Sequence, residues 1–202
     1  MKDDAGYDIQ YLDVEQGLNS SYINAMTTDA DGNMWLATLT GGLSKYDGKS
    51  ISYLTKKEKL LDDNVLSICF DENKKMCLGV GNGFSIYDGY KFINYTEENG
   101  FIDNYIRCII KSRKGGVWIG TEHGLAYYKN GDFTFYSKRE GLLENSIRAL
   151  LEDDKGELWI GTDGGGVAKF DGARFVSYGT EAGLANETIR SLAQDKEKEI
   201  FG

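Results

Sequence analysis

Three arginines occupy the same place in a repeated stretch of the chain. Arg107, Arg148 and Arg190 each follow an isoleucine at the start of a predicted strand. A guanidinium group donates paired hydrogen bonds to planar anions. If the three side chains surround one opening, they predict a site for a carboxylate, a sulfate or a uronic acid. The alternative is that each arginine pairs with a neighbouring carboxylate of this chain, such as Glu122, Asp163 or Glu187.

His123 is the only histidine of the chain and lies beside Glu122. An imidazole next to a carboxylate could act as a general base. The sequence offers no second histidine and no repeated carboxylate cluster that would hold a metal, so we predict neither catalysis nor a cofactor. Asp29, Asp31 and the acidic run 152–154 fall in predicted turns without the full pattern of a calcium loop. We expect these acidic residues to be solvated.

Two tyrosines in predicted loops, Tyr22 and Tyr105, could stack on a sugar ring. Most other aromatic residues are expected to pack in the core. Glycine and asparagine in the same loops have a structural explanation, because both favour turns. The candidate ligand-binding residues are Arg107, Arg148, Arg190, Glu122, His123, Asp163, Tyr22 and Tyr105.

The three cysteines, Cys69, Cys77 and Cys108, are an odd number and have no C-x-x-C spacing. This pattern supports neither a disulfide framework nor a zinc site. We expect buried free thiols. A single disulfide between Cys69 and Cys77, facing each other across a hairpin, is the alternative.

Composition indicates a folded protein and argues against nucleic acid as a partner. The chain has 202 residues, 41% of them hydrophobic, with 26 glycines, no proline and a formal net charge of −9. Affinity for nucleic acid comes largely from Lys and Arg, so this charge argues against that partner.

No apolar run is long enough to span a bilayer, which argues against membrane insertion. The first ten residues lack the features of a signal peptide, which we expect to have been removed if one existed.

The elements that must position the candidate residues repeat along the chain. Units begin at 17, 59, 100, 141 and 183, at intervals of 41 or 42 residues. All three tryptophans share one register in these units, in the column Trp35, Cys77, Trp118, Trp159 and Phe201. Later columns hold Tyr46, Tyr87, Tyr128 and Phe170, and then Tyr53, Tyr95, Tyr136 and Tyr178. Cysteine breaks the first column in the second unit, where we expect weaker packing.

Each unit predicts four short strands. In the fourth unit they cover 146–153, 158–162, 166–170 and 174–178, separated by polar or glycine-containing turns. Asp-Gly or Asn-Gly between the third and fourth strands suits a primed two-residue hairpin turn. Four antiparallel strands per 41 or 42 residues are typical of a β-propeller blade. The fold class is therefore all-β, and residues 1–202 are expected to form a single β-propeller domain.

The number of blades follows from the units. Complete blades are predicted at 17–58, 59–99, 100–140 and 141–182. Residues 183–202 supply only the first strand and the start of the second, whereas residues 1–16 resemble the end of a unit. Together they would make a closing blade that hides exposed strand edges, giving five blades. A fragment of a larger propeller is the alternative.

Residues 141–184, "GLLENSIRALLEDDKGELWIGTDGGGVAKFDGARFVSYGTEAGL", resemble the two-component regulator propeller repeat. The resemblance covers 17–202 and is weakest in the second unit. It implies a periplasmic or extracellular sensor domain that binds a small molecule or an oligosaccharide at the mouth of the central channel. The implied partners are a sensor histidine kinase or a further propeller. A protein-interaction propeller without a small ligand, and a propeller lyase, are the alternative functions.

Overall fold

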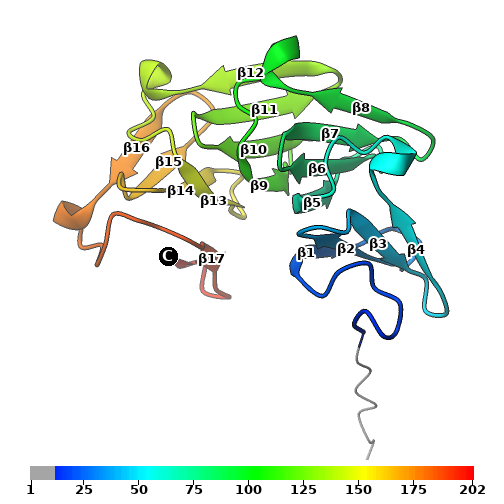
Figure 1. Ribbon diagram of the computed structural model, residues 1–202. Helices are drawn as coiled ribbons and strands as arrows, with labels where there is room; N and C mark the ends of the chain where they lie inside the picture. Colours follow the sequence, from blue (N-terminus) through cyan, green and yellow to red (C-terminus); the bar gives the residue numbers. More distant parts are fainter. Residues whose placement is uncertain (1–11) are drawn as a thin grey trace, which may run out of the picture.

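The computed structural model describes residues 12–202 and has an all-β architecture. Four antiparallel sheets of four strands each are followed by a sheet of two strands. Figure 1 shows the sheets following one another in an arc, with the first strand of each on the inner side. The prediction of propeller blades with four antiparallel strands is confirmed. In the part of the chain that the structure describes, no helix is long and apolar enough to cross a membrane.

Within each sheet the strands are paired in chain order. The first blade contains β1 (Ile23–Thr28), β2 (Met34–Thr38), β3 (Leu43–Tyr46) and β4 (Ile51–Leu54). The second contains β5 (Val65–Phe70), β6 (Met76–Val80), β7 (Gly83–Tyr87) and β8 (Phe92–Tyr95). The third contains β9 (Ile106–Lys111), β10 (Val117–Thr121), β11 (Leu125–Lys129) and β12 (Asp132–Tyr136). The fourth contains β13 (Ile147–Glu152), β14 (Leu158–Thr162), β15 (Val167–Phe170) and β16 (Phe175–Tyr178).

The predicted closing blade is described only in part. Its C-terminal portion forms the two-stranded sheet of β17 (Ala193–Gln194) and β18 (Ile200–Phe201). Before the first blade, the Leu18 N–H donates to the Asp13 carbonyl (2.9 Å), as the Leu60 N–H donates to the Thr55 carbonyl (3.1 Å) before the second. The same kind of turn therefore precedes the first and the second blade. The predicted N-terminal strand lies mainly in residues 1–11, outside the described residues.

Packing between neighbouring blades forms the core. Trp35 of the first blade is 7% exposed and packs in one cluster with residues of the second, among them Val65 and Met76. Trp118 of the third blade meets Phe170 of the fourth edge to face, with ring centroids 6.0 Å apart. Each sheet thus buries apolar side chains against the next one along the arc.

The second blade replaces its tryptophan with Cys77, which is fully buried. Aromatic rings from the second and third blades surround it. Phe84 stacks near Phe101 with centroids 6.0 Å apart, and Tyr128 lies 5.7 Å from Phe84. Cys77 and these rings belong to one buried cluster between the second and third blades. The described cysteines, Cys77 included, are free thiols although Cys69 and Cys77 are paired in the strand register.

One local prediction is wrong, and a second holds for only one of its four turns. Strand register places Leu54, and not Tyr53, opposite Leu43, where Tyr95 stands opposite Phe84 in the second blade. Because a shift of one residue moves a side chain to the other face, Tyr53 is 40% exposed. Of the predicted primed turns, only Asn130-Gly131 has both residues at positive φ (54° and 103°) and joins its strands by two residues.

The Asp-Gly turns instead form four-residue loops held by the aspartate. The Asp47 carboxylate accepts the backbone N–H groups of Lys49 (2.8 Å) and Ser50 (2.7 Å). This arrangement places only Gly48 at positive φ (89°). An aspartate side chain can thus define a turn that competes with the two-residue geometry.

An aspartate, half-buried in the first blade and buried in the fourth, joins each of two hairpins to its tryptophan. Oδ1 of Asp153 accepts two backbone N–H groups of the β13–β14 turn, and Oδ2 accepts the Trp159 indole N–H at 2.9 Å. Asp29 makes the same contact with Trp35 at 2.9 Å. Asp153 is 4% exposed, so the expectation of a solvated turn residue is wrong for it. Its carboxylate is instead part of the packing between strands.

The Asp153→Asn substitution should lower the free energy of unfolding by about 1–3 kcal/mol, because its amide cannot accept both the turn N–H groups and the indole. Asp71→Asn should cost clearly less, since Asp71 caps the equivalent turn but Cys77 replaces the indole donor. Urea unfolding of both variants measures the difference. Equal losses of unfolding free energy in the two variants would contradict a stabilising role for the bond between Oδ2 of Asp153 and the indole.

Candidate functional site

The candidate residues lie on one face of the arc. The loops after β2, β10 and β14 meet the segments that lead into the first strands of their blades. Backbone hydrogen bonds join them, from the Glu122 N–H to the Tyr105 carbonyl (3.2 Å) and from the Asp163 N–H to the Ser146 carbonyl (2.9 Å). We call this surface, formed by residues 19–22, 38–42, 104–107, 121–124, 145–148, 162–166 and 187–190, the mouth face.

Glu122 links the third blade to the fourth. Its Oε1 accepts a hydrogen bond from the Arg107 guanidinium at 2.5 Å, within the same blade. Its Oε2 accepts the Ser146 hydroxyl at 2.6 Å, from the segment entering the next blade. The side chains of Arg107 and Glu122 are 41% and 31% exposed. The pair therefore sits at the surface, and Glu122 also makes a contact across the blade interface.

Asp163 repeats this arrangement one blade further on. It forms an ion pair with Arg148 of the fourth blade and accepts the Thr188 hydroxyl at 3.1 Å. A β-bridge also joins Asp163 to Thr188. The Nε of Arg148 is buried and has no hydrogen-bond partner among the described residues. Two successive blade interfaces are thus closed by the same set of arginine, carboxylate and hydroxyl.

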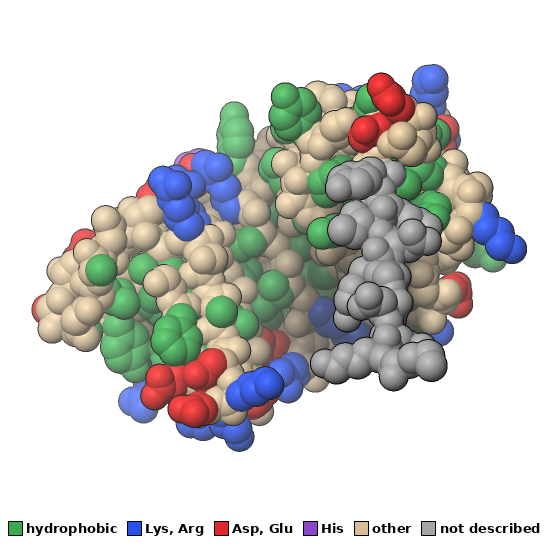
Figure 2. All heavy atoms as spheres, turned by 90° about the horizontal axis from the view of Figure 1, so that it is seen from below, with side chains coloured by type: hydrophobic (Ala, Val, Ile, Leu, Met, Phe, Trp, Pro, Cys, Tyr) green, Lys and Arg blue, Asp and Glu red, His purple; other side chains and the backbone are tan. Residues whose placement is uncertain are grey.

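The structure therefore shows the predicted ion pairs for two of the three arginines. Arg107 pairs with Glu122, and Arg148 pairs with Asp163. Arg190 is exposed and forms no ion pair within residues 12–202. Glu187, its expected partner, accepts the Thr180 hydroxyl at 3.1 Å instead. Figure 2 shows Lys and Arg side chains gathered at the upper left rim of the molecule, beside the histidine.

The ion pairs shift the titration of their members. The Arg107 hydrogen bond, followed by that of Ser146, holds the pKa of Glu122 below its ordinary value. The hydrogen bond from Arg148 likewise lowers the pKa of Asp163, and Asp163 raises the pKa of Arg148. Both carboxylates are therefore charged at neutral pH. The positive charge of each paired arginine is largely balanced.

His123 is held by a residue that the sequence analysis did not identify. Its Nδ1 lies 3.0 Å from Oδ2 of Asp103, and its backbone N–H donates to the same oxygen at 2.9 Å. Asp103 is fully buried, whereas the His123 side chain is 69% exposed. The equivalent positions in other units hold Ser20, Asp62, Glu144 and Asn186. A polar residue recurs at this position. Only in the third unit does the loop after the second strand of the blade supply a histidine.

The described residues contain no group of three or more His, Cys, Asp or Glu side chains placed to hold a metal ion. The buried Asp103 can orient the imidazole of His123. Because the ring is largely exposed, it can also present its other nitrogen as a hydrogen-bonding group.

Tyr22 and Tyr105 are the exposed aromatic residues of the mouth face, at 72% and 63%. They occupy the same position in the first and third blades. The backbone of each is fixed, since the Tyr22 carbonyl accepts the Leu39 N–H (3.0 Å) and the Tyr105 carbonyl accepts the Glu122 N–H (3.2 Å). The two rings are therefore presented to solvent from rigid positions.

The Glu122→Gln substitution tests the clamp between the third and fourth blades. Because the folded state lowers the pKa of Glu122, its stabilisation is complete above the unfolded value of about 4.3 and is lost as the pH falls through the lower folded value. The variant should be less stable than the parent by at most about 1 kcal/mol at pH 7. The difference should shrink below about pH 4.

Thermal unfolding between neutral and acidic pH measures this difference. Glu98→Gln, in the exposed 3-10 helix η2 (Glu97–Asn99), is the control and should follow the parent at each pH. A loss for Glu122→Gln that persists unchanged in acid would contradict the charged clamp.

Three solved structures resemble most of this chain. An extracellular domain assigned to a hybrid two component system of B. thetaiotaomicron has a TM-score of 0.81 and 24% identity, over 88% of this chain and 26% of that one. Virginiamycin B lyase from Staphylococcus aureus has a TM-score of 0.69 and 11% identity, over 89% and 62%. PorZ, a surface component of the type-IX secretion system of Porphyromonas gingivalis, has a TM-score of 0.62 and 18% identity, over 85% and 29%.

These identities show a shared β-propeller fold, and the chain spans about a quarter of the B. thetaiotaomicron domain, 26% of its length. A comparison with curated protein sequences finds no match. The family model described as "Two component regulator propeller" matches residues 17–40, 100–123 and 141–164. Each match runs from the start of a unit to the loop after the second strand of its blade. The first, third and fourth blades of this β-propeller therefore carry the two component regulator propeller repeat.

Proposed function

We propose that this chain is a ligand-binding sensor propeller of the two component type, acting in the periplasm or outside the cell. The repeat in three blades supports this proposal, as does the similarity to an extracellular domain assigned to a two component system. In this proposal the mouth face binds a small molecule or an oligosaccharide. A sensor histidine kinase or a further propeller would receive the signal.

The observation that carries the proposal is the pair of exposed tyrosines on the mouth face, which also holds the two arginine–carboxylate pairs. Tyr22 and Tyr105 offer flat aromatic surfaces, on which the apolar face of a sugar ring can stack. Next to Tyr105, the Arg107–Glu122 pair supplies donors and acceptors, and the Arg148–Asp163 pair lies on the same face one blade further on. Because both arginines are already paired, this surface favours a hydroxyl-rich ligand over a free anion. A uronic acid would depend on the exposed Arg190.

We propose a binding role and not a catalytic one. The S. aureus lyase shares 11% identity, which shows the fold alone. His123 has an orienting carboxylate in Asp103, whereas the carboxylates of Glu122 and Asp163 are engaged by arginines. Glu122, the neighbour of the histidine in the chain, therefore serves to hold two blades together.

A protein-interaction role is the second candidate, and one observation favours it. A hollow of about 530 Å³ lies between the fourth blade and the β17–β18 sheet, lined by apolar residues that include Trp159, Leu184 and Ile200. The corresponding positions between the other blades are filled by the third and fourth strands of the next blade. A further propeller segment would fit the same space.

Oligosaccharide binding is tested by removing the mouth tyrosines. Tyr22→Ala and Tyr105→Ala should each weaken binding of a neutral oligosaccharide by about tenfold, since a lost stacking contact costs about 0.5–1.5 kcal/mol beyond its buried area. Tyr90→Ala is the control, because Tyr90 is 95% exposed in the β7–β8 turn, at the other end of the strands. Isothermal titration calorimetry against neutral and uronic-acid oligosaccharides gives the affinities.

Binding of a uronic acid that depends on Arg190 would identify an acidic ligand at the same face. Binding unchanged by both mouth substitutions, or equally reduced by Tyr90→Ala, would contradict a ligand site at the mouth. Failure of a broad oligosaccharide panel together with retained folding would favour the protein-interaction role.

A further inference from the structure

A second candidate site lies at the opposite end of the strands. A cavity of about 470 Å³ is lined by the β1–β2 turn, the β5–β6 turn and the β7–β8 turn. These turns are at the other ends of the strands from the loops of the mouth face. We call this hollow, between the first and second blades, the turn cavity.

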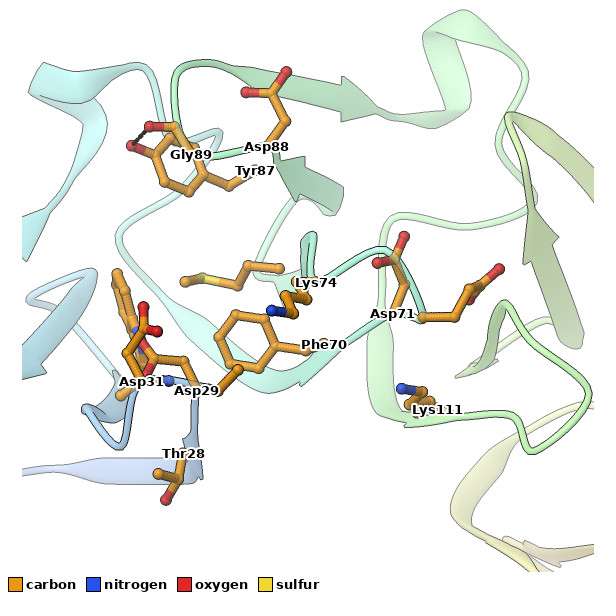
Figure 3. Close-up of a pocket in the computed structure, with 14 residues that line it drawn as sticks. Thr28, Asp29, Asp31, Phe70, Asp71, Lys74, Tyr87, Asp88, Gly89 and Lys111 are labelled. Carbon is orange, nitrogen blue, oxygen red and sulfur yellow. Dashed lines mark hydrogen bonds between the residues drawn. The ribbon is translucent and has the colours of Figure 1, made fainter.

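Aromatic side chains form much of the wall of the turn cavity. Trp35 comes from the first blade, and Phe70 and Tyr87 come from the second. Figure 3 shows Tyr87 and Phe70 on different sides of the hollow, with the Tyr87 hydroxyl bonded to the Gly89 carbonyl. That hydrogen bond, at 2.8 Å, fixes the ring. The volume exceeds that of a single substituted benzene ring, so the walls could enclose one.

The rim of the turn cavity carries an excess of negative charge. Five carboxylates and two ammonium groups line it. They belong to Asp29, Asp31, Asp71, Glu72 and Asp88, and to Lys74 and Lys111. Figure 3 shows Lys74 between Asp71 and the pair Asp29 and Asp31 in this view. The lysines balance part of the charge and leave a field that attracts cations.

One buried carboxylate of the turn cavity lacks a donor that its counterparts have. Oδ1 of Asp71 accepts the N–H groups of Asn73 and Lys75, both at 2.8 Å. In the first and fourth blades the second oxygen of this aspartate accepts a tryptophan indole. The second blade has Cys77 there, and no donor within residues 12–202 reaches Oδ2 of Asp71.

Asp71 as a whole is only 6% exposed, but its Oδ2 is not one of the fully buried atoms without a partner, so this oxygen stays accessible. An accessible carboxylate oxygen that no described protein group donates to can accept a hydrogen bond from a ligand. A ligand that brings an N–H donor into the cavity could make this bond. A positively charged donor would gain most, because charge-assisted hydrogen bonds are the stronger ones.

We propose that the turn cavity binds a small amphipathic cation, an amine or guanidinium attached to an apolar ring. The cationic group donates to Oδ2 of Asp71. The ring packs among Trp35, Phe70 and Tyr87. This site is separate from the mouth face and does not depend on the function proposed there.

Tyramine, p-cresol and 4-hydroxyphenylacetate share a phenol ring and are positively charged, neutral and negatively charged. Comparing their affinities therefore separates the effect of charge from the effect of the ring. Tyramine should bind at least about tenfold more tightly than either of the others, as expected for a hydrogen bond to a buried charge. Titration followed by ¹H–¹⁵N correlation spectra should shift the indole signal of Trp35. The signal of Trp118, which packs between the third and fourth blades, should stay in place.

Substitutions locate the cationic group. Asp71→Asn should weaken tyramine binding by about tenfold or more, since it removes the charge and keeps an acceptor for the turn. Asp195→Asn is the matched control, because Asp195 caps the same turn in the last unit through the Glu199 N–H (2.8 Å) and lies away from the cavity. If Asp71→Asn fails to fold, Asp31→Asn at the exposed rim should still lower the affinity.

Equal affinity for tyramine and p-cresol would overturn the proposal, as would the absence of saturable tyramine binding in the millimolar range. A shift of Trp118 in place of Trp35 would overturn the location. Tyr22→Ala and Tyr105→Ala should leave tyramine binding unchanged. Failure of oligosaccharide binding at the mouth face can therefore be told apart from failure of this site.

Discussion

The structure depends on burying both surfaces of each small sheet against its neighbours. An aromatic side chain buries about 150–250 Å², worth several kcal/mol at about 25 cal/mol per Å². Trp35 and Trp118 place this area at the same register between successive blades. The second blade meets the requirement differently, with Cys77 surrounded by Phe84, Phe101 and Tyr128. The fold requires that each interface between blades is filled, and more than one set of side chains can fill it.

The same geometry explains why polar side chains gather at the mouth face. A constant spacing brings the loop of one blade next to the segment entering the following blade. Glu122 and Asp163 use this proximity to accept both an arginine of their own blade and a hydroxyl of the next. Two of the arginines that suggested an anion site, Arg107 and Arg148, therefore hold the carboxylates that link neighbouring blades. What remains free for recognition is the exposed surface of Tyr22, Tyr105 and Arg190.

Much of the fold could be predicted because every repeat unit shows the same strand positions, so each unit supports the interpretation of the others. The column of Trp35, Trp118 and Trp159 fixes one register, and the four strands of each blade follow from it. The aromatic column fails at Tyr53 because the next residue, Leu54, lies opposite Leu43 and packs against the core. Asp103 and the cavity beside Asp71 could not be found, because each depends on contacts between residues far apart in the chain or on a missing donor.

Hydrogen exchange of a Trp118→Leu variant tests the packing between blades most directly. Trp118 belongs to the third blade but is clustered with residues of the fourth, including Leu142, Ile147 and Phe170. If interfaces between blades stabilise the fold, amide protection should fall in both β9–β12 and β13–β16 and change little in β1–β4. A loss of protection confined to β9–β12 would show that each sheet is stable by itself and would contradict this account.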